Sequence, residues 1–230
     1  MAAKLDLAIQ EAQALLMAVS KHSAEVSERG YGDARLAEFQ SALEMALARD
    51  SAQRGAQATL IQRTETQDSV MKRAYDQLLM VRNAAKSAFG KEKKILKEFR
   101  VGMDRPKTVR EMMSVMDYMT GVVQKHASEL LQNGMSQADV DSVASTYAEL
   151  VTADALQENA KKLRNGATDM RDEALAALQQ EIFKLRKFAQ ARFASRPEIL
   201  QEFTRIPHAG GKRGAPQPAK RVPASTAANA

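Results

Sequence analysis

The chain contains two copies of one sequence pattern, displaced from each other by 104 residues. The copies match KHSAEVSERG at 21–30 with KHASELLQNG at 125–134, and RNAAKSAFGKEKKILKEF at 82–99 with RKFAQARFASRPEILQEF at 186–203. Both pairs align at the same offset without a gap, and further identities lie between them. A single register over this length indicates a tandem duplication, which restricts the chain to folds that use one unit twice.

The residue types of both copies predict helices. Aromatic residues make up 5% of the chain, and there is no Trp or Cys, whereas Ala, Leu, Met, Gln, Glu, Lys and Arg dominate. These are strong helix formers, and the alternating β-branched runs typical of strands are absent. The absence of Cys excludes disulfides and thiolate metal sites. We therefore predict an all-α protein.

Each copy predicts a helix, a tight turn, a long helix and a short terminal helix. In the first copy, the opening helix runs from about Lys4 to Arg29 and ends at Gly30, the residue type preferred just past a helix end. Asp33 is the expected N-cap of the long helix, which extends to Phe89.

The second copy repeats these signals. Thr108 and Glu111 have capping-box spacing at the start of its first helix, and Gly134 ends that helix. Ser136 is the expected N-cap of a long helix that extends to Phe193. A short helix then starts near Ser195-Arg-Pro-Glu198, with Pro in the first turn where its missing N–H costs little.

No Pro interrupts either long helix, so we expect both to be continuous. Gly55 and Asn165-Gly166 are weak points, and a break there would give three helices per copy instead. Two helical hairpins bury little alone, so the copies are expected to pack on each other about a pseudo-twofold axis. The predicted fold is an elongated helical bundle of coiled-coil type, with repeat 1 at residues 1–102, repeat 2 at 103–206 and a C-terminal tail at 207–230.

Polar residues interrupt the apolar stripe of each long helix near its middle, and three recur in both copies. They are Asp50, Gln53 and Thr64 in repeat 1, and Asp154, Gln157 and Thr168 in repeat 2. One interpretation is a buried polar site with two carboxylates for acid–base or ligand chemistry. The other, which we favour, is a hydrogen-bonded layer that fixes the helix register.

A His-x-x-Glu pair also recurs, as His22 with Glu25 and as His126 with Glu129. Residues three apart share a helix face, so each pair presents two metal ligands. Two ligands are too few for a metal site by themselves. We therefore predict no metal centre, and favour pairing of each Glu with the Lys four residues before it.

Four methionines lie close together on the first helix of repeat 2, at Met112, Met113, Met116 and Met119. Methionine fills irregular cores and also lines adaptable binding surfaces. Helical spacing favours the core, but repeat 1 has no such cluster, so a partner surface is the alternative.

The excess positive charge of the chain lies at its C-terminal end. The net charge is +6, and the residues after Phe203 include five basic and no acidic ones. Proline, glycine and alanine dominate the tail, so we expect it to be disordered. Its basic pairs resemble those of linker-histone tails in composition. This resemblance implies weak, salt-sensitive phosphate contacts by Lys212, Arg213, Lys220 and Arg221. The alternative, which we favour, is a flexible basic tether or partner-docking peptide.

No motif names a reaction, since the chain lacks a glycine-rich phosphate loop, a G-x-S-x-G elbow and an H-E-x-x-H helix. We expect a non-enzymatic structural or scaffolding protein, without a cofactor, that binds itself or a protein partner. A nucleic-acid-associated protein and a metal-binding bundle are the alternatives. No stretch approaches the roughly 20 apolar residues of a membrane span, so a cytoplasmic location is expected. The composition resembles that of small bacterial helical proteins.

Overall fold

A computed structural model describes residues 2–204 of the chain. Helices contain 87% of these residues, and no strand occurs among them. The predicted all-α class is confirmed. The tail and its four basic residues singled out above lie outside the described residues.

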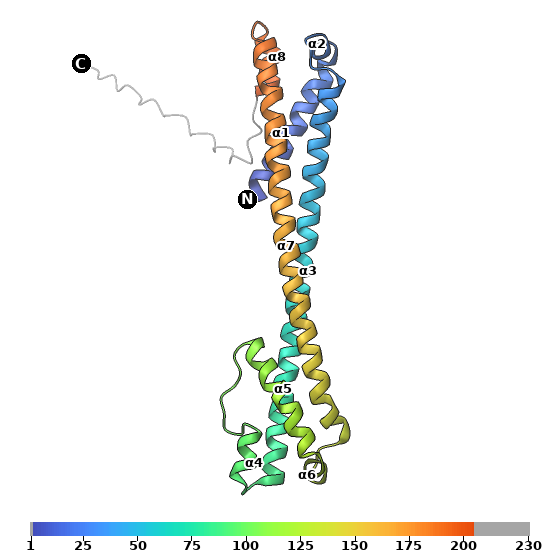
Figure 1. Ribbon diagram of the computed structural model, residues 1–230. Coiled ribbons are helices and arrows are strands. Elements are labelled where there is room, and N and C mark those ends of the chain that lie inside the picture. The colour runs from blue at the N-terminus through green and yellow to red at the C-terminus, as the bar shows by residue number, and fades with distance from the viewer. Residues whose placement is uncertain (1, 205–230) are drawn as a thin grey trace, which may run out of the picture. The chain divides into compact units, whose positions relative to one another are not determined.

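The helices of the described range are shown in Figure 1. In chain order they are α1 (Ala2–Lys21), α2 (Ser23–Glu28), α3 (Asp33–Phe89), α4 (Lys93–Glu98), α5 (Val109–Lys125), α6 (Ala127–Gln132), α7 (Gln137–Arg192) and α8 (Pro197–Thr204). Within residues 2–204, no helix has both the length and the apolar character needed to cross a membrane.

The chain divides into two compact units that do not follow the repeat boundary. Of the described residues, unit 1 comprises 2–44 and 175–204, and unit 2 comprises 45–174. Each of the long helices α3 and α7 contributes one part to each unit. Unit 1 therefore combines the first helices of repeat 1 with the terminal helix α8 of repeat 2. Unit 2 combines α5 and α6 of repeat 2 with the terminal helix α4 of repeat 1.

Both long helices are continuous, as expected. Helix α3 passes through Gly55 and α7 passes through Gly166 without a break. A glycine inside a helix costs roughly 1 kcal/mol relative to alanine, which a helix of more than fifty residues tolerates. The absence of Pro from both segments leaves every backbone N–H available to the helix.

Most of the predicted helix boundaries are found in the structure. Thr108 and Glu111 form a complete capping box at the start of α5. The Ser136 Oγ accepts from the Asp139 backbone N–H at 3.1 Å, so Ser136 caps α7. Gly30 and Gly134 have φ angles of 97° and 102°, the left-handed conformation that favours glycine after a helix.

Two predicted boundaries are wrong. Asp33 is the first residue of α3 instead of its N-cap, and the Gly32 carbonyl accepts the first bonds of the helix. The opening helix is not continuous to Arg29 but bends at His22, where φ is −114° and ψ is 30°. A bend of the same kind, with φ −112° and ψ 23°, separates α5 from α6 at His126. Both bends occur where a histidine ring contacts a distant glutamate, as described below.

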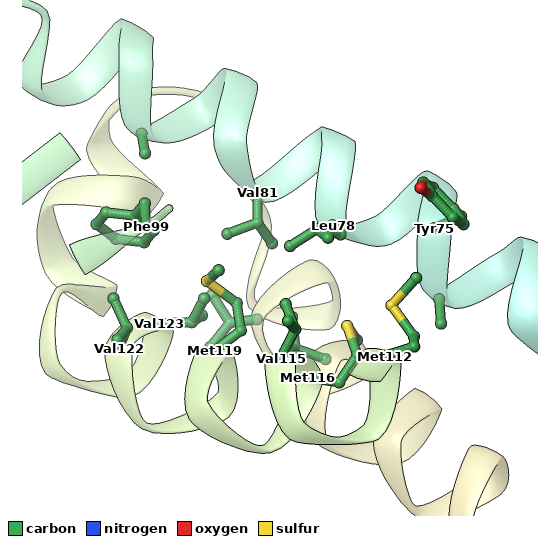
Figure 2. Close-up of a cluster of buried hydrophobic side chains, with 14 of the residues drawn as sticks. Tyr75, Leu78, Val81, Phe99, Met112, Val115, Met116, Met119, Val122 and Val123 are labelled. Carbon is green, nitrogen blue, oxygen red and sulfur yellow. The ribbon is translucent and has the colours of Figure 1, made fainter. Parts of the chain in front are cut away.

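The core of unit 2 forms where α5 packs against the C-terminal part of α3 (Figure 2). Leu78 and Val81 of α3 face the methionine and valine side chains of α5. Phe99, which follows α4, is fully buried and stacks on Phe89 with 5.8 Å between ring centroids. The aromatic pair anchors the end of the short helix α4, whose own residues are exposed or half-buried.

Unit 1 has a corresponding core. Phe203 of α8 is fully buried and stacks on Phe193, again with 5.8 Å between ring centroids. The apolar side chains of α1 are buried at the spacing of one helix face: Leu5, Ala8, Ala12, Leu15 and Val19. Phe39 of α3 and Leu178 of α7 complete the core.

Candidate functional site

Within unit 2, α3 and α7 run antiparallel, because contacts that advance along α3 step backward along α7. Gln67 Nε2 donates to Asp154 Oδ1 at 2.8 Å, and six residues further along α3, Arg73 pairs with Glu149. Near the end of α3, Gln77 accepts a hydrogen bond from the Thr146 hydroxyl. The polar side chains between these helices therefore bond to residues that are distant in sequence.

The predicted polar layer is only partly brought together. Gln157, which is 8% exposed, donates to the Thr64 hydroxyl at 3.4 Å. Asp154 accepts from Gln67. Gln67 is not among the residues shared by the two repeats, because repeat 2 has Arg171 at the equivalent position. These contacts join α3 to α7.

Two other members of the predicted layer bond within their own helix. Asp50 pairs with Arg54 at 2.8 Å on its own helix, and the Thr168 hydroxyl donates to the Arg164 carbonyl one turn earlier. Gln53 is half-buried. The two aspartates thus have different partners, and the arrangement does not combine them into one carboxylate pair.

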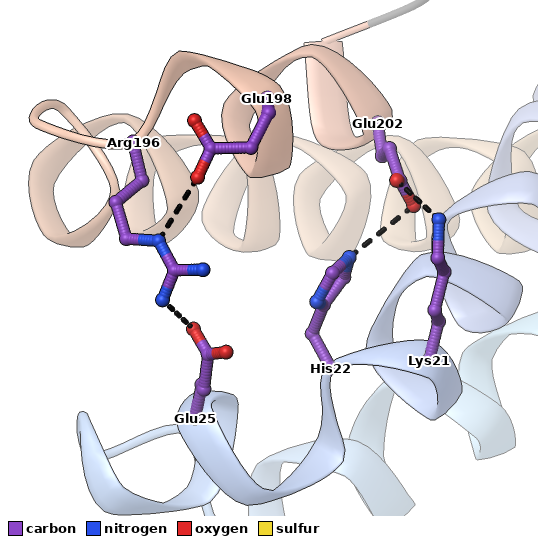
Figure 3. Close-up of polar contacts among 6 residues, drawn as sticks. All are labelled: Lys21, His22, Glu25, Arg196, Glu198 and Glu202. Carbon is purple, nitrogen blue, oxygen red and sulfur yellow. Dashed lines mark hydrogen bonds and ion pairs between the residues drawn. The ribbon is translucent and has the colours of Figure 1, made fainter.

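The histidine of repeat 1 contacts the terminal helix of repeat 2 (Figure 3). His22 Nε2 lies 3.3 Å from Glu202 Oε2, and Lys21 Nζ lies 2.5 Å from Glu202 Oε1. Glu25, the predicted second ligand, instead accepts from Arg196 Nη1 at 2.7 Å. These ion pairs attach α8 to the junction between α1 and α2.

Unit 2 contains the same arrangement with the repeats interchanged. His126 Nε2 lies 3.1 Å from Glu98 Oε2, and Lys125 Nζ lies 2.9 Å from the same oxygen. The His126 ring is 8% exposed and contacts Phe89 and Phe99, with centroids 5.3 and 5.5 Å apart. Hydrogen bonds from Lys125 and then His126 hold the pKa of Glu98 below its usual value.

These contacts give the recurring His-x-x-Glu pairs a structural role in place of metal binding. Each histidine faces a glutamate of the other repeat, and Glu129 accepts from the neighbouring Ser128 hydroxyl at 2.9 Å. Among residues 2–204, no group of three or more His, Asp or Glu side chains is arranged to hold a metal ion.

The methionine cluster belongs to the core of unit 2 and is not a partner surface. Met112, Met116 and Met119 have no exposed area, and Met113 packs partly buried against the same core. The cluster lies on the face of α5 that packs against α3 (Figure 2), because its spacing places it on a single helix face. The four methionines thus take the core position that their helical spacing favoured, and the alternative of a partner surface is not what their burial indicates.

Sequence reasoning missed a stripe of exposed apolar side chains on α7 within unit 2. Leu156, Leu163 and Met170 are 39%, 60% and 50% exposed. They are spaced seven residues apart, which places them on one helix face. The heptad spacing was visible in the sequence, but only the structure shows that these residues are exposed. The Met170 sulfur also accepts from Arg49 Nη1 of α3 at 3.4 Å. We call these three residues the α7 stripe.

The facing part of α3 has little core of its own. Between Ala46 and Val70, no apolar side chain of α3 is buried, and Ile61 is 51% exposed. This part of unit 2 therefore keeps a polar interface between its two helices and an apolar stripe on the outside.

Comparison of the chain with protein-family models, curated protein sequences and solved structures finds no match.

Proposed function

We propose that the protein is a non-enzymatic scaffold that associates with a second copy of itself through the α7 stripe. The observation that carries the proposal is the heptad spacing of Leu156, Leu163 and Met170, all exposed on one face of a long helix. Apolar residues that repeat every seven positions are the sequence pattern by which helices pair.

In unit 2, polar side chains lie between α3 and α7, whereas the α7 stripe is apolar and exposed. Hydrogen bonds join α3 to α7 here, from Gln67 to Asp154 and from Gln157 to Thr64. Between Ala46 and Val70, α3 contributes no buried apolar side chain to this interface. A second copy that covers the stripe would add the missing apolar burial. With a twofold axis both copies contribute the same surface, and the pairing closes as a dimer.

The magnitude indicates a reversible association. Fully burying a large apolar side chain contributes about 1.5–3 kcal/mol, so a half-exposed one contributes roughly 1 kcal/mol more when covered. Six such side chains, three from each copy, contribute about 6 kcal/mol, which is comparable with the cost of losing independent motion. The stripe by itself therefore supports only a weak dimer, which we expect to form at high protein concentration and to dissociate on dilution.

We further infer that the tandem duplication underlies this architecture, with the two repeats related by pseudo-twofold symmetry. Helix α2 starts at Ser23 and its counterpart α6 at Ala127, and α4 starts at Lys93 and α8 at Pro197, each pair at the repeat offset. The matched pairs His22–Glu202 and His126–Glu98 also support it. In each, a histidine of one repeat binds the terminal helix of the other.

The decisive experiment is sedimentation velocity over a range of protein concentrations. Leu163→Glu places a charge in the middle of the α7 stripe, and it should shift the protein to the monomer at every concentration. Leu79→Glu is the matched control, because Leu79 is 50% exposed in the same unit but lies on α3. A wild-type protein that sediments as a monomer throughout, or a dimer insensitive to Leu163→Glu, would refute the proposal.

A second candidate function rests on charge. The residues after Phe203 carry five basic and no acidic side chains, whereas the rest of the chain is close to neutral. Such a segment neutralises phosphates and gives salt-dependent binding to nucleic acid. We propose a gel shift at low salt in which Lys212, Arg213, Lys220 and Arg221 are all replaced by glutamine. Unchanged binding by this variant would exclude the tail as the contact.

A further inference from the structure

Unit 2 contains a cavity of about 620 Å³ beside the segment that connects α4 to α5. Five of the eleven residues that line it are basic: Arg82, Arg100, Arg105, Lys107 and Arg110. Two carboxylates, Asp104 and Glu111, also line it. Glu111 Oε2 already accepts the backbone N–H groups of Lys107 at 2.7 Å and Thr108 at 3.2 Å, as the capping box requires. The cavity therefore has a clear excess of positive charge.

Arg82 is the innermost of these groups and is incompletely satisfied. Its Nη1 donates to the Met103 carbonyl at 3.2 Å, but its Nε is buried without a hydrogen-bond partner. Burial lowers the pKa of Arg82, the nearby Tyr75 raises it, and the positive charge of Arg100 lowers it again. Among the described residues, no carboxylate forms an ion pair with Arg82.

Unit 1 shows how such an arginine is neutralised within this fold. Arg186 is the residue of repeat 2 that aligns with Arg82, and its Nη1 lies 2.8 Å from Glu11 Oε1. At the position that aligns with Glu11, repeat 2 has Val115, which lines the cavity. Arg186 also keeps nitrogens without a hydrogen bond, but its charge is balanced. Unit 2 lacks this internal carboxylate.

The backbone near the cavity holds a second arginine in an uncommon conformation. Arg100 has a φ angle of 51°, the left-handed position after a helix that glycine usually occupies. Its guanidinium lies 4.9 Å from the centre of the Tyr118 ring, and that of Arg105 lies 3.4 Å from the centre of the Tyr75 ring. Stacking on aromatic rings orients both planar cations while leaving their N–H groups available.

We propose that this cavity binds a small molecule that carries two or more phosphate groups. Guanidinium groups match phosphate oxygens with paired, charge-assisted hydrogen bonds, and the cavity presents four of them with one lysine. The N-terminus of α5, at Val109, adds the positive end of a helix dipole. The bound anion takes the place that Glu11 fills in unit 1.

The test measures binding of inorganic pyrophosphate and, separately, of ATP to the full chain by isothermal titration calorimetry. Val115→Glu supplies unit 2 with the carboxylate that unit 1 has and should weaken binding by at least about tenfold, a change of about 1.4 kcal/mol. Arg110→Glu reverses an exposed cavity charge in the first turn of α5, where an acidic residue is favourable for the helix. It should weaken binding by a similar factor.

Lys162→Gln is the control, because it removes one positive charge from an exposed position of unit 2 away from the cavity. It should leave the affinity within about twofold, a change of roughly 0.4 kcal/mol. Circular dichroism checks the fold of each variant, and if Val115→Glu does not fold, Arg110→Glu decides. Binding of pyrophosphate without ATP would indicate an inorganic or small phosphate ligand, and binding of ATP an organic one. Absence of binding to both, or equal losses in Arg110→Glu and Lys162→Gln, would overturn the proposal.

Discussion

Replacing Phe99 with alanine removes a ring that has no exposed area and that holds the terminal helix of repeat 1 in unit 2. The ring stacks on Phe89 and contacts His126, so its loss leaves an unfilled space between α3, α4 and α5. Burial of the ring contributes roughly 2–3 kcal/mol, and the cavity left behind raises the cost of such a change to about 3–5 kcal/mol. We expect the free energy of unfolding to fall by this amount.

Urea unfolding followed by far-ultraviolet circular dichroism measures the change, and hydrogen exchange should place the lost protection in α4 and α5. Phe183→Ala is the matched control, because that ring is 60% exposed and its removal should change stability by less than about 0.5 kcal/mol. A loss below about 1 kcal/mol for Phe99→Ala would refute the reasoning. So would equal losses in the two variants, because the aromatic pair would then not hold the unit together.

Four further substitutions test other parts of the structure. The pKa of Glu98 is lowered by its lysine and histidine partners, so its stabilisation is present above its unfolded value of 4.5 and is lost as pH falls through the lower folded value. Glu98→Gln should therefore flatten the fall of stability below pH 4.5 in acid titrations followed by circular dichroism. Gly55→Ala should stabilise α3 by roughly 0.5–1 kcal/mol in urea unfolding, whereas Gly134→Ala, at a φ angle of 102°, should destabilise by roughly 1–2 kcal/mol. Asp154→Ala leaves the buried Gln67 amide without its acceptor and should cost about 1–3 kcal/mol by the same measurement.

Local signals in the sequence were sufficient for most helix boundaries. The capping box at Thr108, the cap at Ser136 and the glycines that end α2 and α6 depend on residues within four positions of one another. Such interactions form within one or two helical turns, so the sequence displays them directly. The bend at His22 was not predicted, because it accompanies a contact with Glu202, about 180 positions away in the chain.

The candidate sites were predicted less well, for the same reason. Polar residues on a helix indicate that an interface is present, but not which residues of the other helix face them. Asp154 was identified correctly as a polar residue of the stripe, whereas its partner Gln67 has an arginine at the equivalent position and so escapes a search for identities. The cavity around Arg82 had no local signal, because its cations come from α3, α5 and the segment between α4 and α5.

The terminal helix of each repeat belongs to the compact unit that the first helices of the other repeat form. Neither repeat contains a complete compact unit, because Glu202 of repeat 2 binds His22 of repeat 1 and Glu98 of repeat 1 binds His126 of repeat 2. Each unit is therefore completed by a contact between a histidine of one repeat and a glutamate of the other. The two repeats differ at the position of Glu11 and Val115. Glu11 forms an ion pair with Arg186, whereas Val115 cannot pair with Arg82, whose Nε has no hydrogen-bond partner. Differences between the copies at such positions are where a duplicated helical framework can acquire a binding site without losing its fold.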